Sequence, residues 1–382
     1  MLLDRVIAFF TSLRLTVVCL ALAMVLVLAG TLAQVHLGLY EAQQRYFQSF
    51  FVFWTPQGSS LRIPVFPGGY LVGGVLLINL VASHLKRFKM TADKAGIWMV
   101  HLGLILLLVG QLLTDLLSQE STLHLREGEA KNYSVADRQA ELVIIDPSDP
   151  QSDKVFSIPQ KVLMGRREVR HPELPFTIRV QQFYPNSIVE NRGTNTAVPA
   201  AATQGIGPLA TVKPLPKVTV TDRRDVPSAI VEAVTDKGSL GTWLVSEYIE
   251  QPQTIEANGR NYQIQMRPRR FYKPFSIQLV DFRHDVYPGT TIPKNFSSRV
   301  ILNRAETGEN REVLIYMNNP LRYAGETFYQ ASFDPDDQGT ILQVVRNPGW
   351  LTPYVACIVV GLGLVVQFAT HLFGFTLKRR TQ

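Results

Sequence analysis

Histidine is the residue type in this sequence that points most directly to chemistry. Seven histidines occur among the 382 residues, and His84, His101 and His371 fall within or at the ends of long apolar stretches. Ionisable side chains are rare in such stretches, because placing them in hydrocarbon is costly. Three roles are open to an imidazole there: ligation of a metal or haem iron, proton relay, and a hydrogen bond between neighbouring helices.

The residues around these histidines narrow the choice of metal. Near them the sequence has no cysteine, aspartate or glutamate that would complete a zinc or di-iron cage. Cys19 and Cys357 lie in separate apolar stretches without a CxxC pair, which is typical of small buried side chains. Histidine alone in apolar surroundings suits axial ligation of haem iron.

His101 is the strongest candidate ligand, because it lies deepest in its stretch, with Trp98 one turn away. His84 and His371 are weaker candidates, since the ends of membrane spans commonly carry polar side chains. His101 and His371 each lie seven residues from a lysine, or roughly 10 Å of helix, which predicts similar depths. A simple hydrogen bond between helices remains open for all three. The other four histidines are predicted to be exposed or satisfied at the surface: His36, His124, His171 and His284.

Four apolar stretches are long enough to span a membrane, which takes roughly 20 residues. They cover residues 15–34, 69–85, 96–113 and 351–375. Their basic flanks carry nine Lys and Arg against two acidic residues, which accounts for the whole net charge of +7. The positive-inside rule then predicts that both termini lie in the cytoplasm. Because topology explains the net charge, the charge does not indicate a nucleic-acid-binding surface. We interpret the first stretch as an uncleaved anchor, with a cleaved signal peptide as the alternative.

The hydrophilic segment 116–350 is predicted to be an all-β domain outside the cytoplasm, either a sandwich or barrel-like. Short alternating runs are separated by turn signals such as Asn258-Gly259. The expected strands are 140–145, 176–183, 217–221, 242–248, 262–266, 275–282, 299–302, 312–317 and 340–345. Residues 175–180 resemble residues 274–279, which predicts two related β units. Residues 195–216, rich in Ala, Gly and Pro, are predicted to form a long loop between them.

The chain is therefore expected to divide into five regions. Residues 1–35 hold the first membrane helix, and 36–68 form an outer loop. Residues 69–115 hold the second and third helices with a basic cytoplasmic loop, 116–350 the β domain, and 351–382 the fourth helix with its tail. In the outer loop, aromatic residues at spacings of three and four predict an amphipathic helix: Tyr46, Phe47, Phe50, Phe51 and Trp54.

Hydrolase and nucleotide-binding patterns are absent from the sequence, including GxSxG and GxxxxGK[ST]. A set of short segments, in order, resembles instead the ResB-type cytochrome c biogenesis proteins of the system II pathway. These segments are IPVFPGGY at 63–70, ASHLKRF at 82–88, KAGIWMVHLG at 94–103, EGEAKNY at 127–133, PGT at 288–290, PKNFSS at 293–298, NPLRYAG at 319–325, YQASF at 329–333 and NPGW at 347–350. The resemblance covers nearly the whole chain.

The resemblance implies a membrane subunit that works with a CcsA/ResC-type protein to move haem b across the membrane and present it to apocytochrome c. It implies no enzyme acting alone, but part of a haem export and cytochrome c synthase (haem lyase) complex. It points to His101 as one axial ligand of a haem near the inner face, with the opposite ligand supplied by the partner. Thioredoxin-like thiol reductants of the same pathway and membrane lipid are further expected partners.

The positive charge expected at the cytoplasmic ends of the helices suits haem as a bound molecule. Haem is planar and apolar with anionic propionates, so basic residues at the rim suit it: Lys86, Arg87, Lys89 and Lys94. The expected location is a bacterial cytoplasmic membrane, with a thylakoid as the alternative. A second function also stays open, in which the chain is a structural assembly or chaperone subunit that binds apocytochrome or the partner without ligating haem. A third is a sensor or export accessory whose β domain binds an envelope ligand.

Overall fold

The computed structural model describes residues 2–56, 61–87, 91, 94–165, 168–193, 199–218, 223–290 and 292–380. Contacts divide the chain into two compact units. One is helical and is built from the two ends of the chain, up to Gln119 and from Arg346 onward. The other contains nearly all of Glu120–Val345 and is built from strands.

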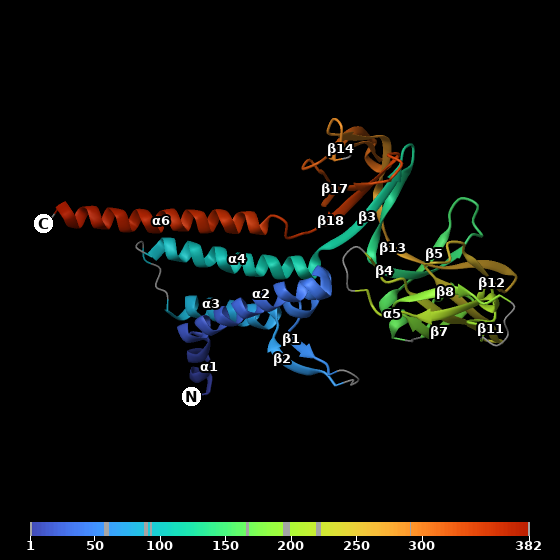
Figure 1. The fold of residues 1–382 in the computed structure, drawn as a ribbon, viewed down its shortest axis with the longest axis horizontal. Coiled ribbons are helices and arrows are strands. Elements are labelled where there is room, and N and C mark those ends of the chain that lie inside the picture. Colours follow the sequence, from blue (N-terminus) through green and yellow to red (C-terminus); the bar gives the residue numbers. More distant parts are fainter. Residues whose placement is uncertain are drawn as a thin grey trace. The chain divides into compact units, whose positions relative to one another are not determined.

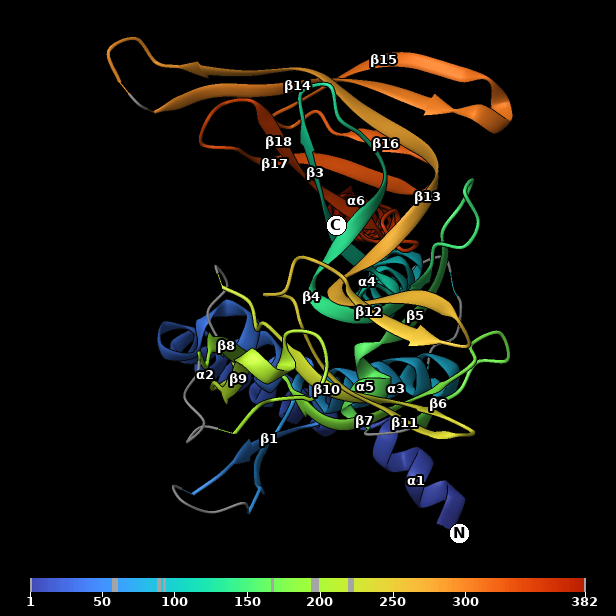
Figure 2. The same ribbon diagram turned by 90° about the vertical axis from the view of Figure 1, so that its right-hand side faces the viewer.

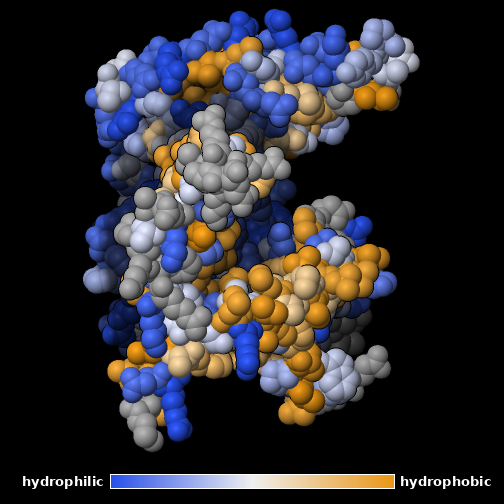
Figure 3. All heavy atoms as spheres, turned by 90° about the vertical axis from the view of Figure 1, so that its left-hand side faces the viewer, coloured by the Kyte–Doolittle hydropathy of each residue, from blue (hydrophilic) through white to orange (hydrophobic). Residues whose placement is uncertain are grey.

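The helical unit consists of apolar helices with a small β-hairpin. Its helices are α1 (Leu2–Phe10), α2 (Leu13–Ala42) with η1 (Gln43–Phe47), α3 (Gly69–Arg87), α4 (Ala95–Leu117) and α6 (Thr352–Arg380) (Figure 1). Within the described residues, four helical segments are long and apolar enough to cross a membrane: Leu13–Phe47, Gly69–Lys86, Ala95–Leu117 and Thr352–Thr376. Large apolar side chains such as Leu28 and Phe368 are exposed, as lipid contact requires (Figure 3). The four predicted spans are confirmed.

Glycines let α4 and α6 pack closely side by side. Gly96, Gly103 and Gly110 recur every seventh residue on α4 and are all buried. A Cβ atom at Gly103 would lie 2.4 Å from the Val360 Cγ2, and one at Gly96 would lie 2.6 Å from the backbone nitrogen of Gln367. Small residues at such positions allow membrane helices to approach backbone to backbone, where van der Waals packing holds them together.

We expect a leucine at Gly363 to separate this helix pair, while a leucine at Gly361 leaves it intact. A Cβ at Gly363 would lie 2.8 Å from the Val100 nitrogen, whereas a Cβ at Gly361 has no heavy atom within 4 Å. Overpacking of this kind costs about 1–3 kcal/mol. Thermal unfolding of the chain in detergent should show a lower midpoint for Gly363→Leu than for Gly361→Leu. Equal midpoints would contradict the close packing.

A buried asparagine fixes the break between α1 and α2. Asn79 of α3 is only 2% exposed. Its Nδ2 donates to the carbonyl oxygens of Phe10 (2.7 Å) and Ser12 (3.1 Å), and its Oδ1 accepts from Thr16 (2.6 Å). These bonds satisfy carbonyl groups near the break, which would otherwise be costly among apolar helices.

The aromatic segment after α2 differs from the predicted amphipathic helix. Helical backbone ends at Phe47, and β1 (Phe51–Trp54) then pairs with β2 (Ile63–Pro67) in an antiparallel hairpin. Gly38, with φ 76°, interrupts α2, and the Phe47 ring lies against Gly30. Spacings of three and four fit a helix, but aromatic residues also favour strands once a partner strand is available. The helix prediction for this segment is therefore wrong beyond Phe47.

The other unit is an antiparallel β domain, as predicted. Its largest sheet has ten strands with the central order β15-β14-β13-β4-β3-β18-β17-β16, while β12 pairs with β13 and β5 with β4. These strands are β3 (Gln119–Arg126), β4 (Ala130–Asp146), β5 (Lys154–Pro159), β12 (Gln253–Ala257), β13 (Arg260–Val286), β14 (Pro293–Arg304), β15 (Glu309–Tyr316), β16 (Leu321–Tyr323), β17 (Glu326–Phe333) and β18 (Gly339–Arg346). A four-stranded sheet has the order β11-β10-β7-β6, and β8 pairs with β9. These are β6 (Glu168–Val169), β7 (Thr177–Tyr184), β8 (Ser187–Asn191), β9 (Ala210–Pro214), β10 (Ser228–Thr235) and β11 (Gly238–Ser246), with a short helix α5 (Gln160–Met164).

Two large hydrophobic cores and a smaller third cluster lie within this unit, and strands β4 and β13 extend between the two large cores (Figure 2). The repeated segments of the sequence contribute to different cores. Phe176, Ile178 and Val180 are buried in the first, and their counterparts 99 residues on are buried in the second: Phe275, Ile277 and Leu279. The structure thus gives each predicted β unit its own core.

The loop predicted over residues 195–216 is only partly a loop. Residues 194–198 lie outside the described residues, but β9 pairs with β8 in regular antiparallel register. A strand of five residues with proline at its end gives too short an alternation to be recognised from sequence. Of the expected strand 217–221, Lys217 and Val218 have no strand structure, and the remaining residues lie outside the described ones.

Candidate functional site

The structure brings two of the three candidate histidines together. His84, near the end of α3, and His101, in the second turn of α4, face each other across the helix hairpin. The Nδ1 of His101 lies 3.1 Å from the Nε2 of His84, and the two ring centroids are 4.7 Å apart at an interplanar angle of 89°. His84 is only 6% exposed.

The hydrogen-bond pattern fixes which nitrogen of each ring carries a proton. The Nδ1 of His84 lies 2.9 Å from the carbonyl oxygen of Leu80, which only accepts, so this nitrogen donates. With both rings neutral, the form favoured among apolar helices, the Nε2 of His84 accepts a hydrogen bond. The Nδ1 of His101 must then donate to it. In this tautomer the lone pair of His101 resides on Nε2.

The face of α4 that carries His101 is distinct from the face that packs on α6. Lys94, Trp98 and His101 follow the spacing of one helix face, i, i+4 and i+7, while the glycines form the contact with α6. The Trp98 ring meets His84 edge-on with centroids 4.8 Å apart. The pair is thus held by an aromatic side chain and by helix packing.

The predicted basic rim is described in part. Lys86 lies two residues after His84 and is exposed, and Lys94 immediately precedes α4 and is exposed as well. Lys89 and the side chain of Arg87 lie outside what the structure describes. The described rim residues are therefore two cations at the ends of the two helices that carry the histidines.

His371 is placed elsewhere on α6. It is exposed, and its Nε2 lies 2.7 Å from the Nε2 of Gln367 one turn earlier. Gly96 of α4 faces Gln367, and Gly103 faces Val360, so the residue level with His101 lies near Leu362. His371 is nine residues further on, or about 14 Å along the helix. The predicted equal depth of His101 and His371 is not observed along this helix pair.

Three of the remaining histidines are exposed, as expected, whereas His284 is partly buried and its Nε2 has no hydrogen-bond partner among the described residues. The Nε2 of His124 lies 2.9 Å from Asp334, the Nδ1 of His284 lies 3.0 Å from Asp337, and His171 lies 3.9 Å from Glu173. His36 is exposed. Within the part of the chain that the structure describes, no group of three or more His, Cys, Asp or Glu could hold a metal ion.

Sequence reasoning treated His84 and His101 separately and missed their pairing. The signal that could have revealed it was topological. Two antiparallel helices joined by a short segment bring residues on either side of that segment into contact, and seventeen residues separate this pair. The role of Asn79 was also missed, because a single polar residue in an apolar stretch does not reveal its partner.

Comparison with known proteins shows what this chain is similar to. Residues 236–341, within the β unit, match the model of the ResB-like family. Protein NrfI of Wolinella succinogenes is 24% identical to this chain over 293 residues. That alignment covers 76% of this chain but only 29% of the relative, so the chain spans less than a third of that protein's length. Part of the β unit is thus similar to the ResB-like family, and most of the chain is similar to part of Protein NrfI.

Proposed function

We propose that this chain is a membrane subunit of cytochrome c biogenesis that ligates haem iron through His101 and helps present the haem to apocytochrome c. One observation carries the assignment: the imidazoles of His84 and His101 meet within the helix hairpin, with the Nδ1 of His101 3.1 Å from the Nε2 of His84. The similarity of residues 236–341 to the ResB-like family and of most of the chain to Protein NrfI supports the pathway.

The hydrogen bond between the two rings has the form expected for a ligand and its support. Histidines that ligate metals almost always donate their other ring N–H to an acceptor, which fixes the ring and raises its basicity. Here a second imidazole is that acceptor, and its own Nδ1 is held by the carbonyl of Leu80. His84 is accordingly a positioning residue in this proposal, and His101 is the ligand.

The surroundings suit haem as a cargo. Its macrocycle is apolar and fits between apolar helices, while its propionates are anionic. Lys86 and Lys94 supply positive charge near the ends of α3 and α4, and Arg87 and Lys89 complete the proposed rim. Ligation of the iron on both faces by histidine would hold it in a defined redox state, since axial ligands set the potential.

The second axial ligand comes, in this proposal, from a CcsA/ResC-type partner in the same membrane. The topology has both termini of the chain in the cytoplasm of a bacterial cell and the β unit in the periplasm. There the β unit binds the partner or the apocytochrome, whose cysteines the thioredoxin-like reductants keep as thiols. In this proposal the chain contributes to a haem lyase complex and does not act as an enzyme alone.

A structural assembly subunit is the alternative function, and one observation favours it. The bond between His84 and His101 already satisfies a polar group on each helix, so both histidines could serve packing alone. In that case the chain would bind its partner normally but hold no haem.

The absorption spectrum of the purified chain, with and without the coexpressed partner, separates the two functions. We expect a Soret band in the wild type with partner, its loss in His101→Ala, and its retention in His371→Ala, a matched control in the same helical unit. A wild type that copurifies with its partner but never with haem would support the assembly function instead. A band unchanged in His101→Ala would remove His101 as the ligand.

A further inference from the structure

A small cavity in the β unit combines positive charge with an apolar wall. It measures about 230 Å³ and lies where β3, β4 and β13 run side by side. Its lining contains no carboxylate and consists of Thr122, Leu123, His124, Lys131, Tyr133, Val135, Arg267, Pro268 and Arg270. This cavity plays no part in the proposed haem site, which lies in the helical unit.

Strand register explains why these side chains meet. Thr122 of β3 pairs with Val135 of β4, which in turn pairs with Arg270 of β13. Tyr133, two residues before Val135, faces the same side of the sheet, and its ring centroid lies 5.7 Å from that of Tyr272. β13 is irregular on either side of this segment, where its register with β4 shifts.

Arg270 is the cavity-lining arginine whose side chain pairs with no carboxylate among the described residues. Its guanidinium lies 4.3 Å from the centre of the Tyr133 ring. Among the described residues it forms no ion pair with a carboxylate, although it is only partly exposed. An arginine stacked on an aromatic ring is held in place, and its planar N–H groups match a carboxylate.

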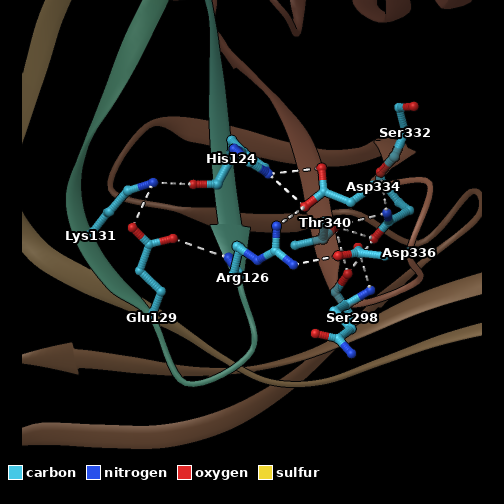
Figure 4. Close-up of polar contacts among 11 residues, drawn as sticks. His124, Arg126, Glu129, Lys131, Ser298, Ser332, Asp334, Asp336 and Thr340 are labelled. Atoms are coloured by element: carbon cyan, nitrogen blue, oxygen red, sulfur yellow. Dashed lines mark hydrogen bonds and ion pairs between the residues drawn. The ribbon is translucent and has the colours of Figure 1, made fainter. Parts of the chain in front are cut away.

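The other cations of the cavity are already balanced by carboxylates outside its lining. Lys131 lies 2.8 Å from Glu129 and donates to the backbone of His124, while the His124 ring is bonded to Asp334 (Figure 4). Arg267 lies 3.0 Å from the buried Glu141. These pairs hold the walls in position, so that among the described residues of the lining Arg270 is the cation without a carboxylate partner.

We propose that this cavity binds the carboxylate of an organic anion, with Arg270 as its principal contact. The apolar wall of Leu123, Val135 and Pro268 beside the charge favours a carboxylate attached to an apolar group over a free inorganic anion. The volume admits either a small aromatic acid or one acidic side chain of a peptide. Both ligands would be recognised in the same way, by hydrogen bonds from the arginine guanidinium to a carboxylate.

The test titrates the full chain in detergent with three probes, followed by ligand-detected NMR. The probes are benzoate, a terminally blocked Tyr-Glu-Tyr peptide and inorganic phosphate. We expect saturable binding of a carboxylate, with the tighter of benzoate and peptide identifying the source. Phosphate should bind more weakly than either, and added salt should weaken binding because the contact is ionic.

Arg269→Gln is a matched control for Arg270→Gln. Arg269 precedes Arg270 on the same strand, but it lies over Phe271, bonds to Gln139 and does not line the cavity. Arg270→Gln should weaken carboxylate binding at least about tenfold, since a charge-assisted bond is lost. Arg269→Gln should change it less than about twofold, as expected of a distant charge. Arg270→Lys keeps the positive charge but lacks the paired N–H groups of the guanidinium. Its affinity for the carboxylate should therefore lie between those of Arg270→Gln and Arg269→Gln.

The proposal is overturned by any of three results. The first is that neither carboxylate binds saturably to the wild type. The second is equal loss in Arg270→Gln and Arg269→Gln with circular dichroism spectra unchanged. The third is phosphate binding as tight as benzoate, which would remove the role of the apolar wall. Because the readout is binding to the β unit, its failure leaves the haem proposal untouched.

Discussion

Replacing His84 by alanine is expected to weaken haem binding about 10- to 100-fold while leaving the ligand His101 in place. Loss of a second residue that orients a metal ligand typically has an effect of this size. Without His84, the Nδ1 of His101 loses its acceptor at 3.1 Å, and the imidazole loses its fixed tautomer and orientation. Titration of haem into the purified chain with its partner, followed by the Soret band, measures the change.

His84→Gln is the informative companion variant, because a glutamine carbonyl can still accept a hydrogen bond. We expect it to bind haem more tightly than His84→Ala and less tightly than the wild type. His101→Ala should show no specific binding at all. If His84→Ala abolished binding while His101→Ala retained it, the roles of ligand and positioning residue would be reversed.

The second large effect is expected in the β unit, at a buried ion pair. The Lys273 side chain is 3% exposed, and its Nζ lies 2.8 and 2.7 Å from the two oxygens of Glu326. Replacing Glu326 by alanine should lower the free energy of unfolding by about 3–5 kcal/mol, because it removes the carboxylate that contacts the buried Lys273 ammonium. Chemical denaturation followed by circular dichroism at β-sheet wavelengths checks this.

A double variant separates the loss of this ion pair from a general loss of packing. Lys273→Met with Glu326→Leu removes both charges and keeps apolar volume next to the Phe328 ring, which Lys273 already contacts. Such replacements of whole buried pairs are often neutral or stabilising. A double variant as unstable as Glu326→Ala alone would show that shape, not charge, governs this position.

The sequence predicted the architecture well where the signal is local. Apolar length identified the four spans, and alternation identified most of the long strands of the β unit, including both ends of β13. Asn258 and Gly259 form the expected turn, with φ of 52° and 73°, before β13 begins at Arg260. These features depend on a few neighbouring residues, which the sequence displays directly.

The predictions that were wrong or incomplete concern features that depend on residues distant in the chain. Phe51 and Trp54 lie in a strand because residues 63–67 pair with them, which no spacing rule could indicate. The separation of His371 from His101 follows from the glycine contacts that set the register of α6 on α4. The pairing of His84 with His101 likewise needed the packing of two helices.

Rescue by imidazole tests the role of His101 most directly. Glycine at this position should remove the haem iron's ligand from this chain but leave space where free imidazole can bind. With the partner present, millimolar imidazole is predicted to restore the Soret band to His101→Gly, and to leave His84→Gly unchanged. If imidazole restored neither variant, or restored His84→Gly alone, His101 would not be the ligand.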